Sequence, residues 1–133
     1  MARMAVLVMR VLVTAFLAIL FLQSGLDKVT DRAGNRAYLN GVFEKSPLRR
    51  FTGFLFVVIT ILEVLTGVLC AAGVLALVFF EADALAAIGA LLAALVFISL
   101  FFGQRLAKDY AGAAGLVPYF LLSLVAIGLS GVS

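Results

Sequence analysis

The sequence predicts an all-α integral membrane protein, with four transmembrane helices in an antiparallel bundle. Two observations carry this prediction. Of the 133 residues, 65% are hydrophobic and only 13% are charged, with a mean hydropathy of +1.25. Four apolar segments each approach or exceed the roughly 20 residues that a helix needs to cross a bilayer. A small water-soluble domain buries only about 60–70% of the surface its unfolded chain exposes, so it could not hide this much apolar surface.

The predicted helices cover residues about 4–26, 51–80, 84–104 and 110–132, and all belong to one transmembrane domain, 1–133. Arg10 and Gln23 interrupt the first segment, and Pro118 lies within the fourth. A membrane helix tolerates proline where neighbouring groups satisfy the freed carbonyl. The turn Glu81-Ala82-Asp83 is so short that the second and third helices should form a tight hairpin.

The sequence of the first loop predicts a short interfacial amphipathic segment, because apolar residues recur in it at helical spacing. These side chains are Tyr38, Leu39, Val42 and Phe43. Basic residues on its other side would meet anionic headgroups. A lid over a pocket between the helices is the alternative.

The orientation of the protein in the membrane can be predicted from its Lys and Arg residues, because loops rich in them lie on the cytoplasmic side. The first and third loops share one side and hold Lys28, Arg32, Arg36, Lys45, Arg49, Arg50, Arg105 and Lys108. The other side has Arg3 and Arg10. We therefore expect both loops in the cytoplasm and both termini outside, in a multi-pass protein of the bacterial cytoplasmic (inner) membrane.

The composition also excludes several chemistries. The chain has no His and a single Cys, Cys70, so it offers no His-ligated haem, no His-containing zinc site and no intrachain disulfide. We expect no metal site, and no cofactor bound by this chain alone except a quinone or a lipid. A net charge of +3, concentrated in loops, does not indicate nucleic-acid binding.

Glu63 is the most informative polar residue, because it lies about 18 Å along a helix that starts near Phe51. A carboxylate near the bilayer centre costs at least a few kcal/mol unless it is paired or protonated, and such residues commonly mark functional sites. Three roles remain open. Glu63 could pair with Arg10 or Lys28. It could be protonated and hydrogen-bonded to a neighbour, or it could handle a proton or a polar group of a ligand. The candidate neighbours are Gln23, Ser24, Thr60 and Thr66.

Other polar positions lie on the first helix. Arg10 would either snorkel to the interface or pair with Glu63. A polar cluster of Gln23, Ser24, Gly25 and Asp27 would close the helix. Gly25 would permit close contact with another helix or a ligand.

Small residues line one side of the third helix and predict close helix packing. They are Ala82, Ala86, Gly89, Ala90 and Ala94. This face would pack inside the bundle or dock a partner subunit.

Several of these residues fall into a known pattern: Ser24-Gly25-Leu26-Asp27-Lys28, Tyr38, Gly41, Pro47, Glu63-Val64-Leu65-Thr66-Gly67 and Gly73. With the four-span layout, the pattern resembles the DoxX-like family of small bacterial membrane proteins. The chain departs from the family at Thr66-Gly67, where members often have two glycines, and in a third helix without histidines. The resemblance implies that Gly25, Lys28 and Glu63 correspond to the family's characteristic residues. It also implies a link to quinone oxidoreductases, since one member is a subunit of thiosulfate:quinone oxidoreductase.

The leading functional hypothesis is an accessory subunit of a larger membrane complex, a quinone-linked respiratory or redox complex, which is not catalytic alone. Its partners would be other membrane-protein subunits and the lipid bilayer. The alternatives are a non-catalytic assembly protein that binds partner helices, and a small-solute transporter that would have to be a homo-oligomer.

Overall fold

The computed structural model describes residues 2–42, 44, 47 and 49–131, and all of its regular elements in this part of the chain are helical. Two helices of 29 residues contain the longest apolar runs, and shorter helices connect or follow them. In chain order the elements are α1 (Ala2–Thr30), α2 (Arg32–Val42), the 3-10 turn η1 (Arg49–Phe51), α3 (Thr52–Phe80), α4 (Ala84–Leu106), α5 (Tyr110–Gly115) and α6 (Val117–Ser130).

Four helical stretches are long and apolar enough to cross a membrane, which is consistent with a multi-pass membrane protein. They are Ala2–Thr30, Thr52–Phe80, Ala84–Leu106 and Tyr110–Ser130. The first continues to Thr30, past its expected end near Leu26. The chain turns over Glu81-Ala82-Asp83, where Glu81 caps α3 in the left-handed conformation.

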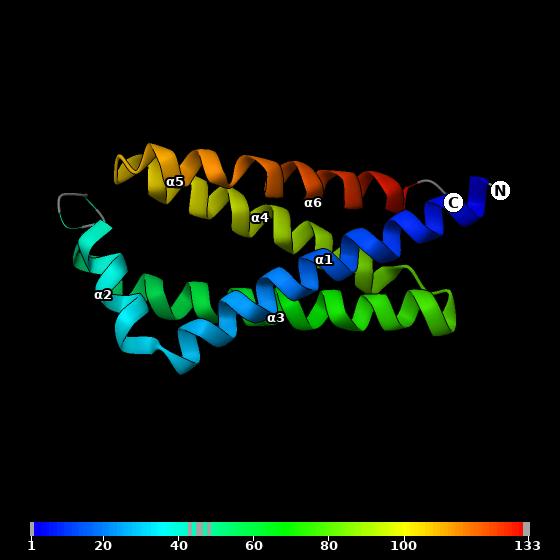
Figure 1. Cartoon of the computed structure of the whole chain (residues 1–133), viewed down its shortest axis with the longest axis horizontal. Helices are drawn as coiled ribbons and strands as arrows, with labels where there is room; N and C mark the ends of the chain where they lie inside the picture. The colour runs from blue at the N-terminus through cyan, green and yellow to red at the C-terminus, as the bar shows by residue number, and fades with distance from the viewer. Residues whose placement is uncertain (1, 43, 45–46, 48, 132–133) are drawn as a thin grey trace.

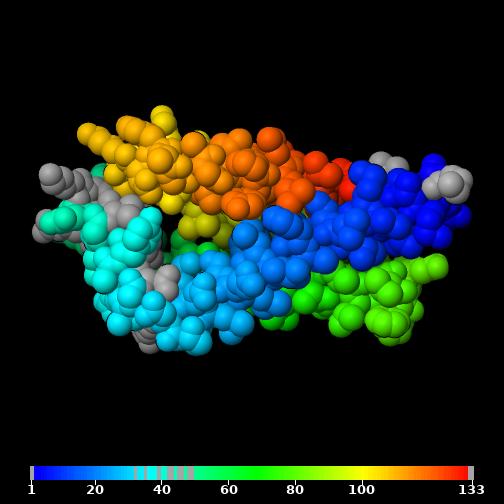
Figure 2. All heavy atoms as spheres, viewed as in Figure 1, coloured from blue at the N-terminus to red at the C-terminus, as the bar shows by residue number. Residues whose placement is uncertain are grey.

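The helices are arranged so that both termini and the α3–α4 turn lie at one end of the molecule, whereas α2 and the α4–α5 turn lie at the other (Figure 1). α1 packs mainly against α3, and α4 packs against both α3 and α6. The space-filling view shows α1 running obliquely across one face, from the end with the termini toward α2 (Figure 2). α1 therefore extends from one end of the molecule to the other, so its side chains reach both ends.

The core forms where α1, α3, α4 and α6 meet. Leu17 and Phe21 of α1 pack there with Cys70 of α3 and with Phe97 of α4. The rings of Phe21 and Phe97 lie with their centroids 4.9 Å apart, and Tyr119 of α6 stacks beyond Phe97 at 6.1 Å. Aromatic contacts thus join three of the four long helices.

The outer surface is apolar on every long helix. Large side chains such as Leu12, Ile61, Leu91 and Leu121 are each more than half exposed. In water such a surface would aggregate, whereas lipid tails solvate it without penalty.

The last span differs from the single helix that the sequence predicts over 110–132, because it divides into α5 and α6 around Leu116. Pro118 lies in the first turn of α6. Proline has no N–H and a fixed φ, which suit a helix start and not its interior.

The first loop contains the helix α2, with Tyr38 63% exposed on it. Of the other apolar residues expected to form one side of this segment, Phe43 and the side chains of Leu39 and Val42 lie outside the described part of the chain.

Candidate functional site

Glu63 lies between α1 and α3 and is held by two groups of α1. The Lys28 Nζ lies 3.0 Å from the Glu63 Oε2, and the Ser24 hydroxyl donates to the same oxygen at 2.9 Å. Lys28 also donates to the Ser24 Oγ at 3.0 Å, so the three groups form a closed set. We call Ser24, Lys28 and Glu63 the triad. The attraction between its two charges and the hydrogen bonds of Ser24 offset part of the cost of burying a carboxylate inside an apolar protein.

Helix geometry explains why a lysine at the end of α1 reaches so far inward. Side chains on a helix tilt toward its N-terminus, and residues four apart lie on one face. Lys28 therefore bends back over Ser24 toward Glu63, with only 15% of its side chain exposed. The carboxylate of Glu63 is more deeply buried, at 5%. Lys28 is thus the member of the triad that lies nearer to the surface.

Gly25 sets the distance between the two helices at this point. A Cβ at Gly25 would lie 2.6 Å from Cγ2 of Val64 and 3.3 Å from its backbone nitrogen. Any side chain here would push α1 away from α3. The glycine thereby brings Ser24 and Lys28 within hydrogen-bond distance of the carboxylate next to Val64.

The other expected neighbours of Glu63 take different places. Gln23 and Asp27 are exposed, so the proposed polar cluster divides into an inner part and an outer part. The hydroxyls of Thr60 and Thr66 donate to carbonyls of their own helix, at 2.7 Å and 2.6 Å. Ser24 is the polar neighbour that the structure brings to the carboxylate.

Arg10 does not meet Glu63, and the expectation that the two pair is wrong. Arg10 is buried and its Nη1 donates to Asp83 of the α3–α4 turn at 2.5 Å. Sequence reasoning missed Asp83 as a partner. The available signal was topological, because four spans place the first part of α1 and the second turn on the same side of the membrane.

The small-residue face of α4 packs inside the protein. Ala86, Gly89, Ala90 and Ala94 are all buried, and a Cβ on Gly89 would lie 2.9 Å from the sulfur of Cys70 on α3. Ala82 is exposed in the turn before α4 and does not belong to this face. The face is occupied by the chain's own helices, so it is not a free docking surface for a partner.

Comparison of the chain with known protein families, with curated proteins and with solved structures finds no match. The chemistry of the triad therefore has to be argued from its own geometry. Inside the α1–α3 pair, the Ser24 hydroxyl is hydrogen-bonded to both the Lys28 ammonium and the Glu63 carboxylate. Such a set can hold a proton, pass it along the hydroxyl, or present an ammonium to a polar group that approaches through the membrane.

Proposed function

We propose that this chain is an accessory subunit of a larger, quinone-linked redox complex in the bacterial cytoplasmic membrane. The observation that carries the proposal is the triad, a buried acid–base set inside a helix pair. Ionisable residues at membrane depth commonly serve proton or substrate pathways. The DoxX-like pattern of the sequence, which includes Lys28 and Glu63, supports the same proposal.

The residue types of the chain favour a subunit that works with a partner's redox centre. Thiolate clusters and His-ligated haem need several Cys or His residues, and this chain has one Cys and no His. Electrons would pass through a cofactor of another subunit or through a quinone. The chain's own contribution would be to move protons or to bind the quinone's polar ring.

Within the triad, the two charged residues have different tasks. Glu63 accepts and returns a proton, and Lys28 lies between it and the end of α1, on the side facing α2. A quinone oxygen that approaches this end meets the Lys28 ammonium first, since that side chain is the more exposed of the two. Ser24 links the two groups and keeps the ammonium oriented.

The finer architecture belongs to the same proposal. The four spans form an antiparallel bundle, with the first and third loops in the cytoplasm, and α2 lies as an amphipathic segment at that interface. Support comes from the excess of Lys and Arg in these loops and from the shared location of α2 and the α4–α5 turn (Figure 1).

Native mass spectrometry of the protein extracted from its own membrane in mild detergent tests the proposal. We expect it to leave with larger subunits that carry redox cofactors. Glu63→Gln should lower the quinone-dependent turnover of that complex by at least about tenfold, as loss of a general base does. The matched control is Glu44→Gln, because Glu44 is exposed.

If Glu63→Gln leaves both assembly and turnover unchanged, the triad has no part in the function and the proposal fails. It also fails if the wild-type protein leaves the membrane alone. A homo-oligomer that carries a solute into liposomes would establish the transporter instead.

A second candidate is an assembly protein without chemistry. It is favoured by the completeness of the triad, since the three groups satisfy one another without any ligand. In this case partners dock on the exposed apolar faces. Ala90→Leu would then disturb the fold before it disturbs association, because Ala90 is buried within the protein. An exposed change such as Leu91→Ala, which leaves the fold intact, should weaken co-purification.

A further inference from the structure

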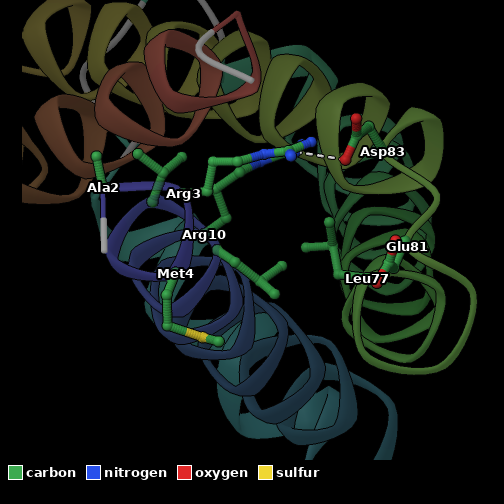
Figure 3. Close-up of a pocket in the computed structure, with 9 residues that line it drawn as sticks. Ala2, Arg3, Met4, Arg10, Leu77, Glu81 and Asp83 are labelled. Carbon is green, nitrogen blue, oxygen red and sulfur yellow. Dashed lines mark hydrogen bonds and ion pairs between the residues drawn. The ribbon is translucent and has the colours of Figure 1, made fainter.

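A cavity lies at the end of the molecule opposite to α2, between the first turns of α1 and the α3–α4 turn. Its volume is about 490 Å³, within the roughly 300–1,000 Å³ of ligand pockets. In Figure 3, Arg10 extends from α1 across this space to Asp83, and Leu77 and Glu81 face it from the other side. The cavity shares no residue with the triad.

Arg10 supplies an unsatisfied donor in the wall of this cavity. Its side chain is 7% exposed and Nη1 is used by Asp83. Among the residues that the structure describes, no acceptor lies within hydrogen-bond distance of Nη2, which is itself buried. A buried donor without a partner costs about 1–3 kcal/mol, and more when it is charged. An acceptor that entered the cavity would remove this cost once the guanidinium turned slightly toward it.

The rim of the cavity carries one further charge of each sign. Arg3 and Glu81 both line it, and within residues 2–42, 44, 47 and 49–131 neither of them forms an ion pair. Arg10 and Asp83 neutralise each other, so the charges available to a ligand are one guanidinium and one carboxylate. The remaining wall is apolar and includes Leu7 and Leu77.

We propose that this cavity binds the headgroup of an aminophospholipid. The phosphate accepts from Nη2 of Arg10 and from Arg3, and the primary ammonium donates to Glu81. The start of an acyl chain lies along Leu7 and Leu77. Arginine suits the phosphate because its planar fork offers several donors to neighbouring oxygens.

Position and charge both favour this class of ligand. Arg10 lies about 12 Å along α1 from Ala2, and it contacts a turn where the chain reverses between two spans, which is the depth of lipid headgroups. An anionic lipid would satisfy Arg10 but would be opposed by Glu81. A choline headgroup has no N–H to donate to that carboxylate. A zwitterion with a primary ammonium complements every free charge of the cavity.

Native mass spectrometry of the full chain in detergent, with added lipids, tests the assignment. We expect phosphatidylethanolamine to bind about tenfold more tightly than phosphatidylcholine or phosphatidylglycerol of the same acyl chains, as one charge-assisted hydrogen bond implies. Arg10→Lys keeps a cation for Asp83 but loses the second nitrogen and the planar fork that presents it to the phosphate, so it should lower this affinity by about tenfold. Glu81→Gln should remove the preference over phosphatidylglycerol.

Matched controls lie at the other end of the molecule. Arg105→Gln and Glu44→Gln change exposed charges far from the cavity and should leave lipid binding unchanged. If Arg10→Lys fails to fold, Arg3→Gln decides, because Arg3 is exposed and should lose affinity by a similar factor.

Equal binding of the three lipids by the wild-type protein would overturn the proposal. So would unchanged binding in both Arg3→Gln and Glu81→Gln. Free phosphoethanolamine binding as tightly as the lipid would show that the ligand is a soluble phosphate ester and not a membrane lipid.

Discussion

α1 carries two cations that are largely removed from solvent, one toward each of its ends, and the two are held in different ways. Lys28 faces a buried carboxylate and shares a hydroxyl with it, so the set is closed. Arg10 faces Asp83, whose side chain is 53% exposed, and its Nη2, beside a cavity, has no partner among the described residues. The cation of Lys28 is therefore satisfied by groups inside the protein, whereas the cation of Arg10 is satisfied only in part, by a carboxylate that water reaches.

The comparison shows that the burial of a charged side chain does not by itself give its contribution to stability. Both cations are largely removed from solvent, but removing each would have different consequences. Loss of Lys28 would leave a carboxylate whose side chain is only 5% exposed, whereas loss of Arg10 would leave one that is 53% exposed. The energetic weight of a buried charge therefore depends on the exposure of its partner.

The largest expected effect comes from Lys28→Met. It leaves Glu63 buried without a counter-charge and should lower the free energy of unfolding by about 3–5 kcal/mol. Denaturant titration of the purified protein in detergent measures this, with Lys108→Met, at an exposed site, as control. The double change Lys28→Met with Glu63→Leu should recover much of the loss. A Lys28→Met protein as stable as wild type would show that the ion pair contributes nothing.

Ser24→Ala should have the second largest effect on stability. It removes the hydroxyl that joins Lys28 to Glu63 but leaves the direct ion pair, so we expect a loss of about 1.5–3 kcal/mol, as for hydrogen bonds to charged groups. The same titration measures it. Ser99→Ala is the matched control, because Ser99 is exposed and its hydroxyl donates to the carbonyl of Leu95 in its own helix. Equal effects of the two changes would mean that the triad is not closed by Ser24.

Gly73→Ala tests the packing of α3 against α4 near the Arg10–Asp83 contact. A Cβ there would lie 2.7 Å from backbone atoms of Ala86, so it should force α3 and α4 apart near the turn that carries Asp83. Overpacking of this kind costs about 1–3 kcal/mol. Gly128→Ala meets nothing within 4 Å and should be neutral or slightly stabilising. A thermal unfolding scan of both variants separates packing from helix propensity, and equal midpoints would contradict the close approach.

Arg10→Met should have the smallest effect, below about 1 kcal/mol, because Asp83 remains hydrated after the change. It is the counterpart of Lys28→Met at the other end of α1, and the same titration applies. A loss as large as that of Lys28→Met would remove the distinction drawn between the two ends.

The four apolar spans could be predicted from the sequence, because hydropathy and length alone indicate membrane helices. The break near Leu116 was harder to place. Pro118 permits either a kinked helix or a new helix start, and the choice depends on the surrounding contacts. The start of α4 at Ala84 agrees with the prediction, and the error lay in counting Ala82, a turn residue, with the small-residue face because it continues the spacing of four.

The candidate site could be predicted only as a set of alternatives. Burial of Glu63 follows from its position, but its partner depends on which face of α1 meets α3. That register is fixed by the fit of Gly25 against Val64, which no local pattern reveals. The Arg10–Asp83 contact joins residues 73 positions apart, and spacing along the chain gives no distance between them.

The reactivity of Cys70 toward thiol reagents can be used to measure how often α3 and α4 separate. The thiol is the sole cysteine of the sequence, is fully buried, and lies against Gly89 in the contact between α3 and α4. A thiol reagent reaches it only after these helices separate. In detergent, the labelling rate at low reagent concentration therefore measures the opening equilibrium of the α3–α4 hairpin, without any introduced probe. Comparing that rate in the presence and absence of lipid would show whether a ligand in the cavity beside the α3–α4 turn also holds the hairpin closed.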